Sequence, residues 1–232
     1  MLFVTDESPG SIGGIASDSS SVYVVRHEVD HVEVRDRETF DVTKKINVPG
    51  LTYARGVAAC QRHNCLYVSD YDKKLIHRVD LDSKAITKWA VNGEPLGLSI
   101  TRNHNLIITL FKTNTIAEYT TQGDLVREIK LDDSIDLLQC CVELSTGQFV
   151  VSHDGSAQHR VLIIDTNGRI VKSYGGPSGS SPGQLIDPYR LTVDTYDNVL
   201  VADCRNNKVQ VSSAALTHLY DVTLPKIGRA HV

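Results

Sequence analysis

The chain has 232 residues, of which 41% are hydrophobic and 22% are charged, with a formal net charge of −4. It is an ordinary globular composition, with enough residues to bury a sizeable core. No apolar run approaches the roughly 18 residues of a membrane span, and the start, MLFVTDESPG, does not resemble a signal peptide. Five cysteines form no disulfide framework, so we favour a reducing, cytoplasmic setting.

Both ends of the chain look cut. The C-terminal run IGRAHV resembles one reading frame of a common sequencing adapter, and we treat residues 226–232 as a non-native tail. Removing Lys226 and Arg229 from the 24 basic residues leaves 22 against 28 acidic residues, a net charge of −6. At the other end, the short apolar run at Phe3 is expected to be the tail of a preceding repeat.

Short runs of alternating apolar residues recur along the chain, each typical of a strand with one buried face. One strand of each repeat supplies an anchor, and the five anchors are Tyr23, Tyr67, Ile107, Phe149 and Leu200. The steps between them are 44, 40, 42 and 51 residues. A period of 40–45 residues with several strands in each repeat indicates the blades of a β-propeller.

We therefore predict an all-β fold in which residues 1–225 form a propeller of four-stranded antiparallel blades. Five blades are expected, at about residues 14–48, 54–91, 94–131, 135–174 and 188–224. Asn-Gly at 167–168 and Asn-Asn at 206–207 supply hairpin turns, where residues that tolerate positive φ are favoured.

Residues 183–211, GQLIDPYRLTVDTYDNVLVADCRNNKVQV, carry the clearest pattern of the chain. Pro188 stands before the first strand, VAD ends the second strand, and NNKVQV forms the third. The segment resembles the NHL repeat, and the second repeat is similar, with Gly56 and the run LYVSD. Three repeats match loosely, because other residues replace the aspartate of VAD: Arg26, Leu110 and Ser152.

The resemblance extends to the NHL domains of tripartite-motif ubiquitin ligases and has consequences for function. NHL propellers commonly close with six blades, so we expect a fragment whose sixth blade is missing or split. The resemblance implies a non-enzymatic scaffold that binds a protein or peptide, with no cofactor and with any ligase chemistry in domains outside this chain. The oligomeric state does not follow from the sequence.

Two alternatives from other functional classes stay open. Related propellers include peptide-amidating lyases and calcium-dependent lactone hydrolases, whose metal ligands point inward near the axis. The expected inner strands here contain no histidine, so we assign no catalytic residue and no metal ligand. The second alternative is single-stranded RNA binding, which the net charge of −6 disfavours.

The partner site is expected where the loops between second and third strands meet the starts of the first strands, on one face of a propeller. Arginines there would bond acidic groups, and aromatic rings would supply contact area. A structural role is the alternative for the two aspartates, which can accept backbone N–H bonds. The ten candidates are Arg26, His27, Arg55, Asp70, Tyr71, Phe111, His153, Asp154, Arg190 and Asp203.

Cys60 and Cys65 flank the four-residue segment QRHN in the first hairpin of the second repeat. Opposed residues at the end of such a hairpin can form a disulfide when they occupy a non-hydrogen-bonded pair. The alternative is that both are small buried residues. Metal sites that combine these cysteines with His63, or His27 with His153 and Cys204, are disfavoured.

Overall fold

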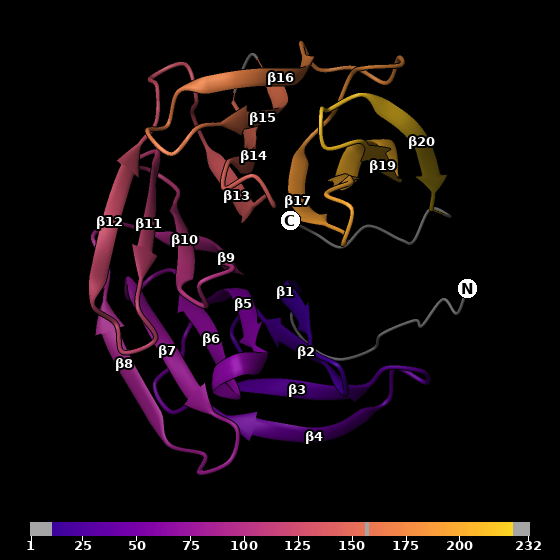
Figure 1. Cartoon of the computed structure of the whole chain (residues 1–232). Coiled ribbons are helices and arrows are strands. Elements are labelled where there is room, and N and C mark those ends of the chain that lie inside the picture. Colours follow the sequence, from indigo (N-terminus) through magenta and orange to yellow (C-terminus); the bar gives the residue numbers. More distant parts are fainter. Residues whose placement is uncertain (1–10, 156–157, 225–232) are drawn as a thin grey trace. The chain divides into compact units, whose positions relative to one another are not determined.

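The computed structural model describes residues 11–155 and 158–224, where twenty strands form five four-stranded antiparallel sheets (Figure 1). The prediction of an all-β fold built from propeller blades is confirmed. The run at Phe3 and the tail at 226–232 lie outside the described residues. The chain divides after Leu98 into two compact units, called unit 1 and unit 2 below.

Unit 1 contains the first two blades, and in each the strand order follows the chain order. Blade 1 consists of β1 (Ile12–Ser17), β2 (Ser21–Arg26), β3 (His31–Asp36) and β4 (Val42–Asn47). Blade 2 consists of β5 (Ala54–Cys60), β6 (Cys65–Asp70), β7 (Leu75–Asp80) and β8 (Ile86–Ala90), with the 3-10 turn η1 (Gln61–His63) between β5 and β6.

Blades 4 and 5 lie in unit 2, and the first strand of blade 3 crosses the division between the units. Blade 3 consists of β9 (Pro95–Ile100), β10 (Leu106–Leu110), β11 (Thr115–Tyr119) and β12 (Leu125–Lys130). Blade 4 consists of β13 (Leu138–Glu143), β14 (Phe149–Asp154), β15 (His159–Ile164) and β16 (Ile170–Gly176). Blade 5 consists of β17 (Pro188–Val193), β18 (Val199–Asp203), β19 (Lys208–Ser212) and β20 (His218–Thr223), with the 3-10 turn η2 (Cys204–Asn206).

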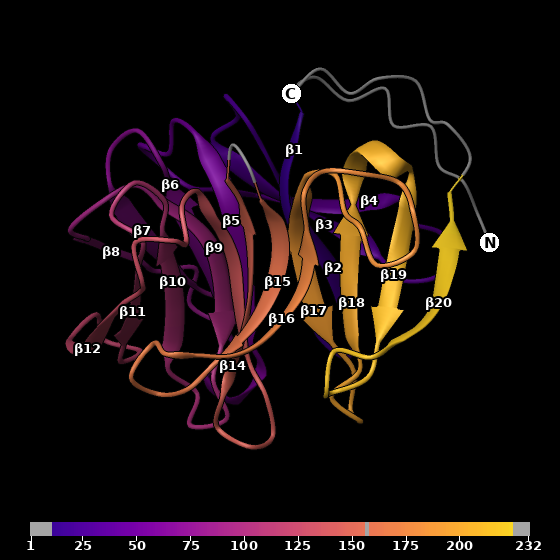
Figure 2. The ribbon, with the colours of Figure 1, turned by 90° about the horizontal axis from the view of Figure 1, so that it is seen from above.

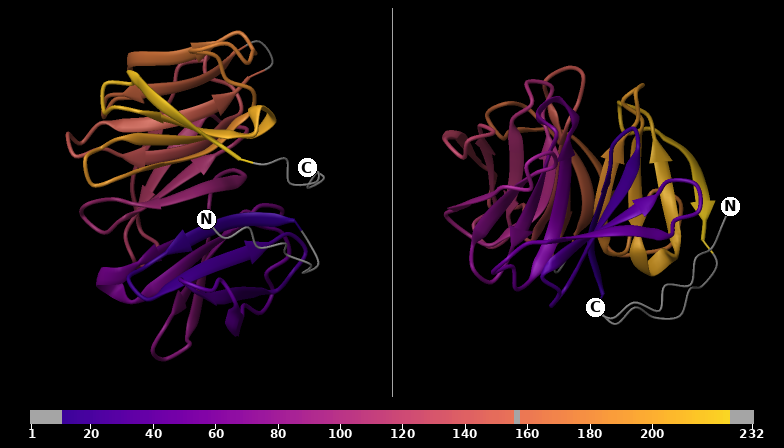
Figure 3. Two further views of the ribbon diagram at one scale, coloured as in Figure 1. Left: turned by 90° about the vertical axis from the view of Figure 1, so that its right-hand side faces the viewer. Right: turned by 90° about the horizontal axis from the view of Figure 1, so that it is seen from below.

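The strands of blade 5 lie side by side in Figure 2, in the order β17 to β20. The left panel of Figure 3 shows the twist of this sheet, which antiparallel strands of L-residues adopt. The outermost strands of the blades are largely exposed, and the inner strands are largely buried. A single sheet cannot bury its apolar faces alone, so the core of each unit forms between consecutive blades.

Three such cores are present among the described residues. In unit 1, Tyr23 and Val25 of β2 pack with Leu66 and Val68 of β6. In unit 2, side chains of blade 3 pack with those of blade 4, and another set joins blade 4 to blade 5. These cores fix the strands whose ends carry the candidate site residues.

The first strand of four blades contains the same irregularity. In β5, Ala54 pairs with Asp70 and Gly56 pairs with Ser69, so the residue between them is an extra, bulged residue. Such a bulge redirects a side chain away from the regular pleat. By the same register, the four bulged residues are Gly13, Arg55, Gln139 and Tyr189.

Candidate functional site

The ladder register divides the ten predicted site residues into two layers. Four of them lie at the end of the second strand of their blade or one residue before it, opposite the residue that precedes the bulge, and at most 4% of their surface is exposed. They are Arg26, Asp70, His153 and Asp203. The other six are partly exposed: His27, Arg55, Tyr71, Phe111, Asp154 and Arg190.

The buried aspartates bind the loops of their own blades. Asp70 accepts hydrogen bonds from the backbone N–H groups of Thr52 and Tyr53, at 2.9 and 3.3 Å, and from the Thr52 hydroxyl. Asp203 accepts from the Ile186 N–H at 2.7 Å and from two side-chain amides, those of Asn206 and Gln210. Both carboxylates therefore have the structural role that the sequence left as the alternative.

Arg26 occupies the equivalent position in blade 1 and belongs to a buried ion network. Its Nε donates to Glu33 at 3.0 Å, and Glu33 also accepts from Arg35 at 2.6 Å. Burial would raise the pKa of Glu33, but the hydrogen bonds from Arg35 and Arg26 outweigh it and hold that pKa below its usual value. The network joins β2 to β3 inside the blade, so Arg26 does not present a binding surface.

In blade 4 this position holds a histidine. The sequence analysis placed Ser152 at the position of Asp203. In the structure Ser152 pairs with Cys140 and His153 pairs with Leu138, so the equivalent of Asp203 is His153. Arg160 Nε donates to His153 Nε2 at 2.8 Å. Burial, followed by the charge of Arg160, lowers the pKa of His153 to about 4, so the ring is neutral at physiological pH.

The accessible candidates of unit 1 form one group, which we call the Arg55 cluster: His27, Tyr53, Arg55 and Tyr71. The Arg55 guanidinium carbon lies 5.1 Å from the ring centre of Tyr53 and 5.5 Å from that of Tyr71. His27 stacks on Tyr53 with ring centres 4.7 Å apart. Three of the four were predicted, and the structure brings these three together.

Tyr53 was not predicted, although it is the centre of the Arg55 cluster. Its backbone N–H donates to Asp70, and its carbonyl accepts from the Tyr71 N–H at 3.0 Å. Asp70 thus positions Tyr53, and the bulge at Arg55 places the guanidinium over both phenol rings. The available signal was the short spacing in TYAR, which puts an aromatic ring two residues before the bulge.

An arginine that lies over two aromatic rings has restricted motion, and its guanidinium group stays planar. Such a guanidinium can donate two parallel hydrogen bonds to a carboxylate. The phenol hydroxyls and the imidazole add groups that donate and accept protons. The Arg55 cluster is therefore suited to binding an acidic group of a small ligand or a peptide end.

The accessible candidates of unit 2 do not form a comparable group. Arg190 lies over the ring of its neighbour Tyr189, with 5.0 Å between the guanidinium carbon and the ring centre. By register the equivalent of Arg55 is Tyr189, and Arg190 is the equivalent of Gly56. Phe111 follows β10, and Asp154 ends β14, where it contacts His159.

Asp154, His159 and Asp187 form a second polar cluster, in unit 2. Asp154 Oδ1 lies 2.5 Å from His159 Nδ1, and Asp187 Oδ1 lies 3.7 Å from the same nitrogen. Burial and then the negative charge of Asp187 raise the pKa of Asp154, and His159 partly opposes them. The sequence singled out only Asp154 of these three.

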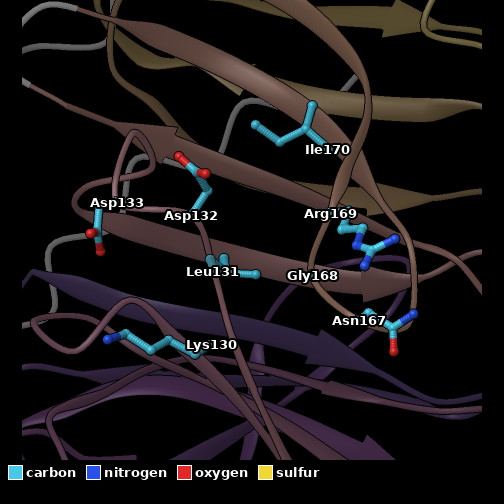
Figure 4. A pocket seen from close by; sticks show the side chains of 8 residues that line it. All are labelled: Lys130, Leu131, Asp132, Asp133, Asn167, Gly168, Arg169 and Ile170. Atoms are coloured by element: carbon cyan, nitrogen blue, oxygen red, sulfur yellow. The ribbon is translucent and has the colours of Figure 1, made fainter.

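A shallow depression of about 520 Å³ lies elsewhere in unit 2, between the segment that follows β12 and the turn between β15 and β16. Figure 4 shows the carboxylates of Asp132 and Asp133 on one side and Arg169 on the other. None of the ten predicted residues lines it. We therefore do not place the functional site there.

Cys60 and Cys65 are register partners at the end of the β5–β6 hairpin, as expected, and both are buried free thiols. Burial raises the pKa of the Cys65 thiol. Among the described residues no helix has the length and apolar character that crossing a membrane requires.

No family model matches the chain. It is 27% identical over 216 residues to the peptidylglycine alpha-amidating monooxygenase of Rattus norvegicus, a match that covers 87% of this chain and 20% of the relative. It is also 28% identical over 111 residues to the human NHL repeat-containing protein 3, covering 44% of this chain and 32% of that protein. The chain thus spans about a fifth of the length of the amidating relative.

Solved structures resemble the chain in fold. A streptogramin B lyase matches with a TM-score of 0.72 at 14% identity, covering 95% of this chain and 71% of the lyase chain. A chain of a nidogen/laminin complex matches with a TM-score of 0.74 at 17% identity, covering 92% of this chain and 80% of that chain. At these identities the likeness concerns the fold alone.

These comparisons support the NHL and β-propeller resemblance, and they correct one expectation. We expected a chain without enzyme activity, but the amidating relative is an enzyme and the fold neighbours include lyases. The sequence-based argument rested on motifs that were not found, and the absence of a recognisable motif does not exclude an enzyme. The similarity to tripartite-motif ligases and the adapter origin of residues 226–232 stay predictions.

Proposed function

We propose that this chain is the propeller portion of an enzyme that acts on the carboxyl end of peptides, and that the Arg55 cluster binds the terminal carboxylate. The observation that carries the proposal is the position of the Arg55 guanidinium over the rings of both Tyr53 and Tyr71. The similarity to an amidating monooxygenase, a protein named for its action on peptidylglycine, supports a peptide substrate with a C-terminal glycine.

Each member of the Arg55 cluster has a defined part in this proposal. Arg55 donates two hydrogen bonds to the carboxylate, and the two phenol rings keep the guanidinium plane in place. A terminal glycine has no side chain, so its carboxylate can approach the rings closely. His27, stacked on Tyr53, is the nearby group able to accept or release a proton.

Binding of matched peptides tests the proposal. A labelled peptide ending in glycine with a free carboxylate is compared by fluorescence anisotropy with the same peptide as the C-terminal amide. We expect the free acid to bind roughly 10-fold or more tightly, because the amide loses the charge-assisted pair, worth about 1.5–3 kcal/mol. Conversion of the free-acid peptide is followed by mass spectrometry in the same samples.

Variants assign the effect to the Arg55 cluster. Arg55→Ala is expected to remove the preference for the free acid, and Arg55→Lys to keep part of it, because a lysine retains the charge but not the planar pair of donors. Arg62→Ala is the matched control, an exposed arginine in η1 beyond the far end of β5. Equal affinity for acid and amide peptides, or unchanged binding by Arg55→Ala, would refute the proposal.

A further inference from the structure

The cluster of Asp154, His159 and Asp187 lies in unit 2 and draws its members from three separate segments. Asp154 ends β14, His159 begins β15, and Asp187 directly precedes β17. One ligand-type atom from each residue lies within 4.8 Å of the other two. The cluster therefore connects the elongated loop of blade 4 to the segment that leads into blade 5.

Three polar atoms converge on His159 Nδ1 in this cluster. The backbone N–H of Asp187 donates to this nitrogen at 3.2 Å, while Asp154 Oδ1 lies 2.5 Å and Asp187 Oδ1 lies 3.7 Å from it. Two carboxylate oxygens this close to one imidazole nitrogen are stabilised by a positive charge among them, either a proton or a metal ion.

The charges around the cluster leave room for a cation. Asp154 and Asp187 bring two carboxyl groups to the imidazole of His159. Arg205 contributes one positive charge through the other oxygen of Asp187, Oδ2, and its side chain is 75% exposed. The Oδ1 atom of Asp187 thus stays directed toward the imidazole, 3.7 Å from Nδ1.

We propose that Asp154, His159 and Asp187 bind one divalent transition-metal cation of the zinc class. One imidazole nitrogen and two carboxylate oxygens form a donor set that such ions accept. Ligand atoms around a tetrahedral zinc ion stand roughly 3.4 Å apart, since each lies about 2.0–2.2 Å from the metal. The Asp187 oxygen is already close to this separation from Nδ1, and Asp154 needs to retreat by roughly 1 Å.

The local backbone permits this movement. Asp154 is the last residue of β14, and Gly155 follows it, so the carboxylate is attached where the regular ladder ends. His159 and Asp187 are held more firmly, because the Asp187 N–H bonds the imidazole and Arg205 bonds the second Asp187 oxygen. A bound ion would fix the end of β14 against the segment that precedes β17. This site does not rest on the proposed peptide function.

Calorimetric titration of the metal-stripped chain with zinc chloride tests the proposal, with manganese chloride as a second probe. We expect one zinc ion per chain and a rise in melting temperature on binding. Asp154→Asn and His159→Gln should each weaken zinc binding by roughly 100-fold. His218→Gln is the matched control, because His218 and Asp221 form a His–Asp pair on β20.

Three results would overturn the proposal. The wild-type chain could bind no zinc with a stoichiometry of one, which would leave a shared proton between Asp154 and His159 as the resolution of their contact. Asp154→Asn and His159→Gln could bind zinc as tightly as the wild type. The loss could also appear equally in His218→Gln, which would indicate adventitious surface binding. The wild-type titration decides the first result even if a variant does not fold.

Discussion

Replacing Asp203 with alanine tests whether the buried layer of aspartates holds the blades together. The carboxylate has no exposed surface and accepts bonds from the Ile186 N–H, the Asn206 amide and the Gln210 amide, at 2.7, 2.8 and 2.7 Å. Asn206 is partly exposed and can turn to water. Gln210 is 1% exposed, and its amide NH₂ group keeps one bond, to the Gln184 carbonyl.

The expected cost follows from the donors that are left unpaired. A buried donor without an acceptor costs about 1–3 kcal/mol, and Asp203→Ala leaves one N–H of the buried Gln210 and the N–H of the half-buried Ile186 without an acceptor. We therefore expect a loss of about 3 kcal/mol in the free energy of unfolding. For a chain of this size the melting temperature falls by roughly 2–4 °C per kcal/mol, hence by about 6–12 °C.

Two probes locate the effect within the chain. Trp89, the sole tryptophan of the sequence, lies in unit 1, so its fluorescence reports that unit, whereas circular dichroism reports every strand. If the units unfold separately, Asp203→Ala lowers the dichroism transition and leaves the fluorescence transition in place. Asp70→Ala should lower the fluorescence transition instead.

Asp194→Ala is the matched control for Asp203→Ala. Asp194 also accepts three hydrogen bonds, from the Tyr196 N–H, the Asn198 N–H and the Asn198 side-chain amide, but it is exposed. Water can replace its carboxylate, so the loss of stability should be clearly smaller. An unchanged melting temperature in Asp203→Ala, or an equal loss in Asp194→Ala, would refute the reasoning from buried donors.

Two further predictions concern unit 1. Burial lowers the pKa of His77, against the opposing charge of Asp70, so the folded state prefers the neutral ring. The neutral ring contributes its full stability above the unfolded pKa of about 6.5, and this contribution is lost as the pH falls below that value. In His77→Gln the urea midpoint should therefore change less between pH 7 and pH 5 than in the wild type. Lys74 has a φ of 54°, so Lys74→Gly should raise the unfolding free energy by about 0.5–1 kcal/mol, whereas Lys73→Gly, where φ is not positive, should lower it.

The blades could be predicted from sequence because their period repeats. In one strand, however, the sequence did not show which residue corresponds to which residue of the other blades. The anchor in blade 4 was placed at Phe149, whereas the register makes Val150 the equivalent of Leu200. Phe149, Val150 and Val151 are all fully buried, so this strand shows no alternation of apolar and polar residues. A strand buried on both faces gives no sign of which face each residue occupies.

Members of the candidate site could be predicted where they occupy a repeated position of a blade. They could not be predicted where their position depends on a contact with a distant segment. The candidates His27, Arg55 and Tyr71 come together, because each follows from a repeated position in its blade. Tyr53 was missed, since its role depends on the bond that Asp70 makes from 17 residues further along the chain. No sequence pattern links Asp187 to Asp154, because β15, β16 and the long loop before β17 separate them.

The repeated bulge makes the chemistry of a blade separable from its stability. A bulged residue pairs with no residue of the neighbouring strand, so exchanging its side chain leaves the hairpin register intact. Arg55, Gln139 and Tyr189 show three different chemistries on this one backbone, whereas Gly13 is fixed, since a Cβ there would lie 2.2 Å from the Ala54 carbonyl oxygen. A combinatorial library confined to Arg55 and Tyr189, the two partly exposed positions among these, would vary the exposed side chains while the scaffold keeps its blades.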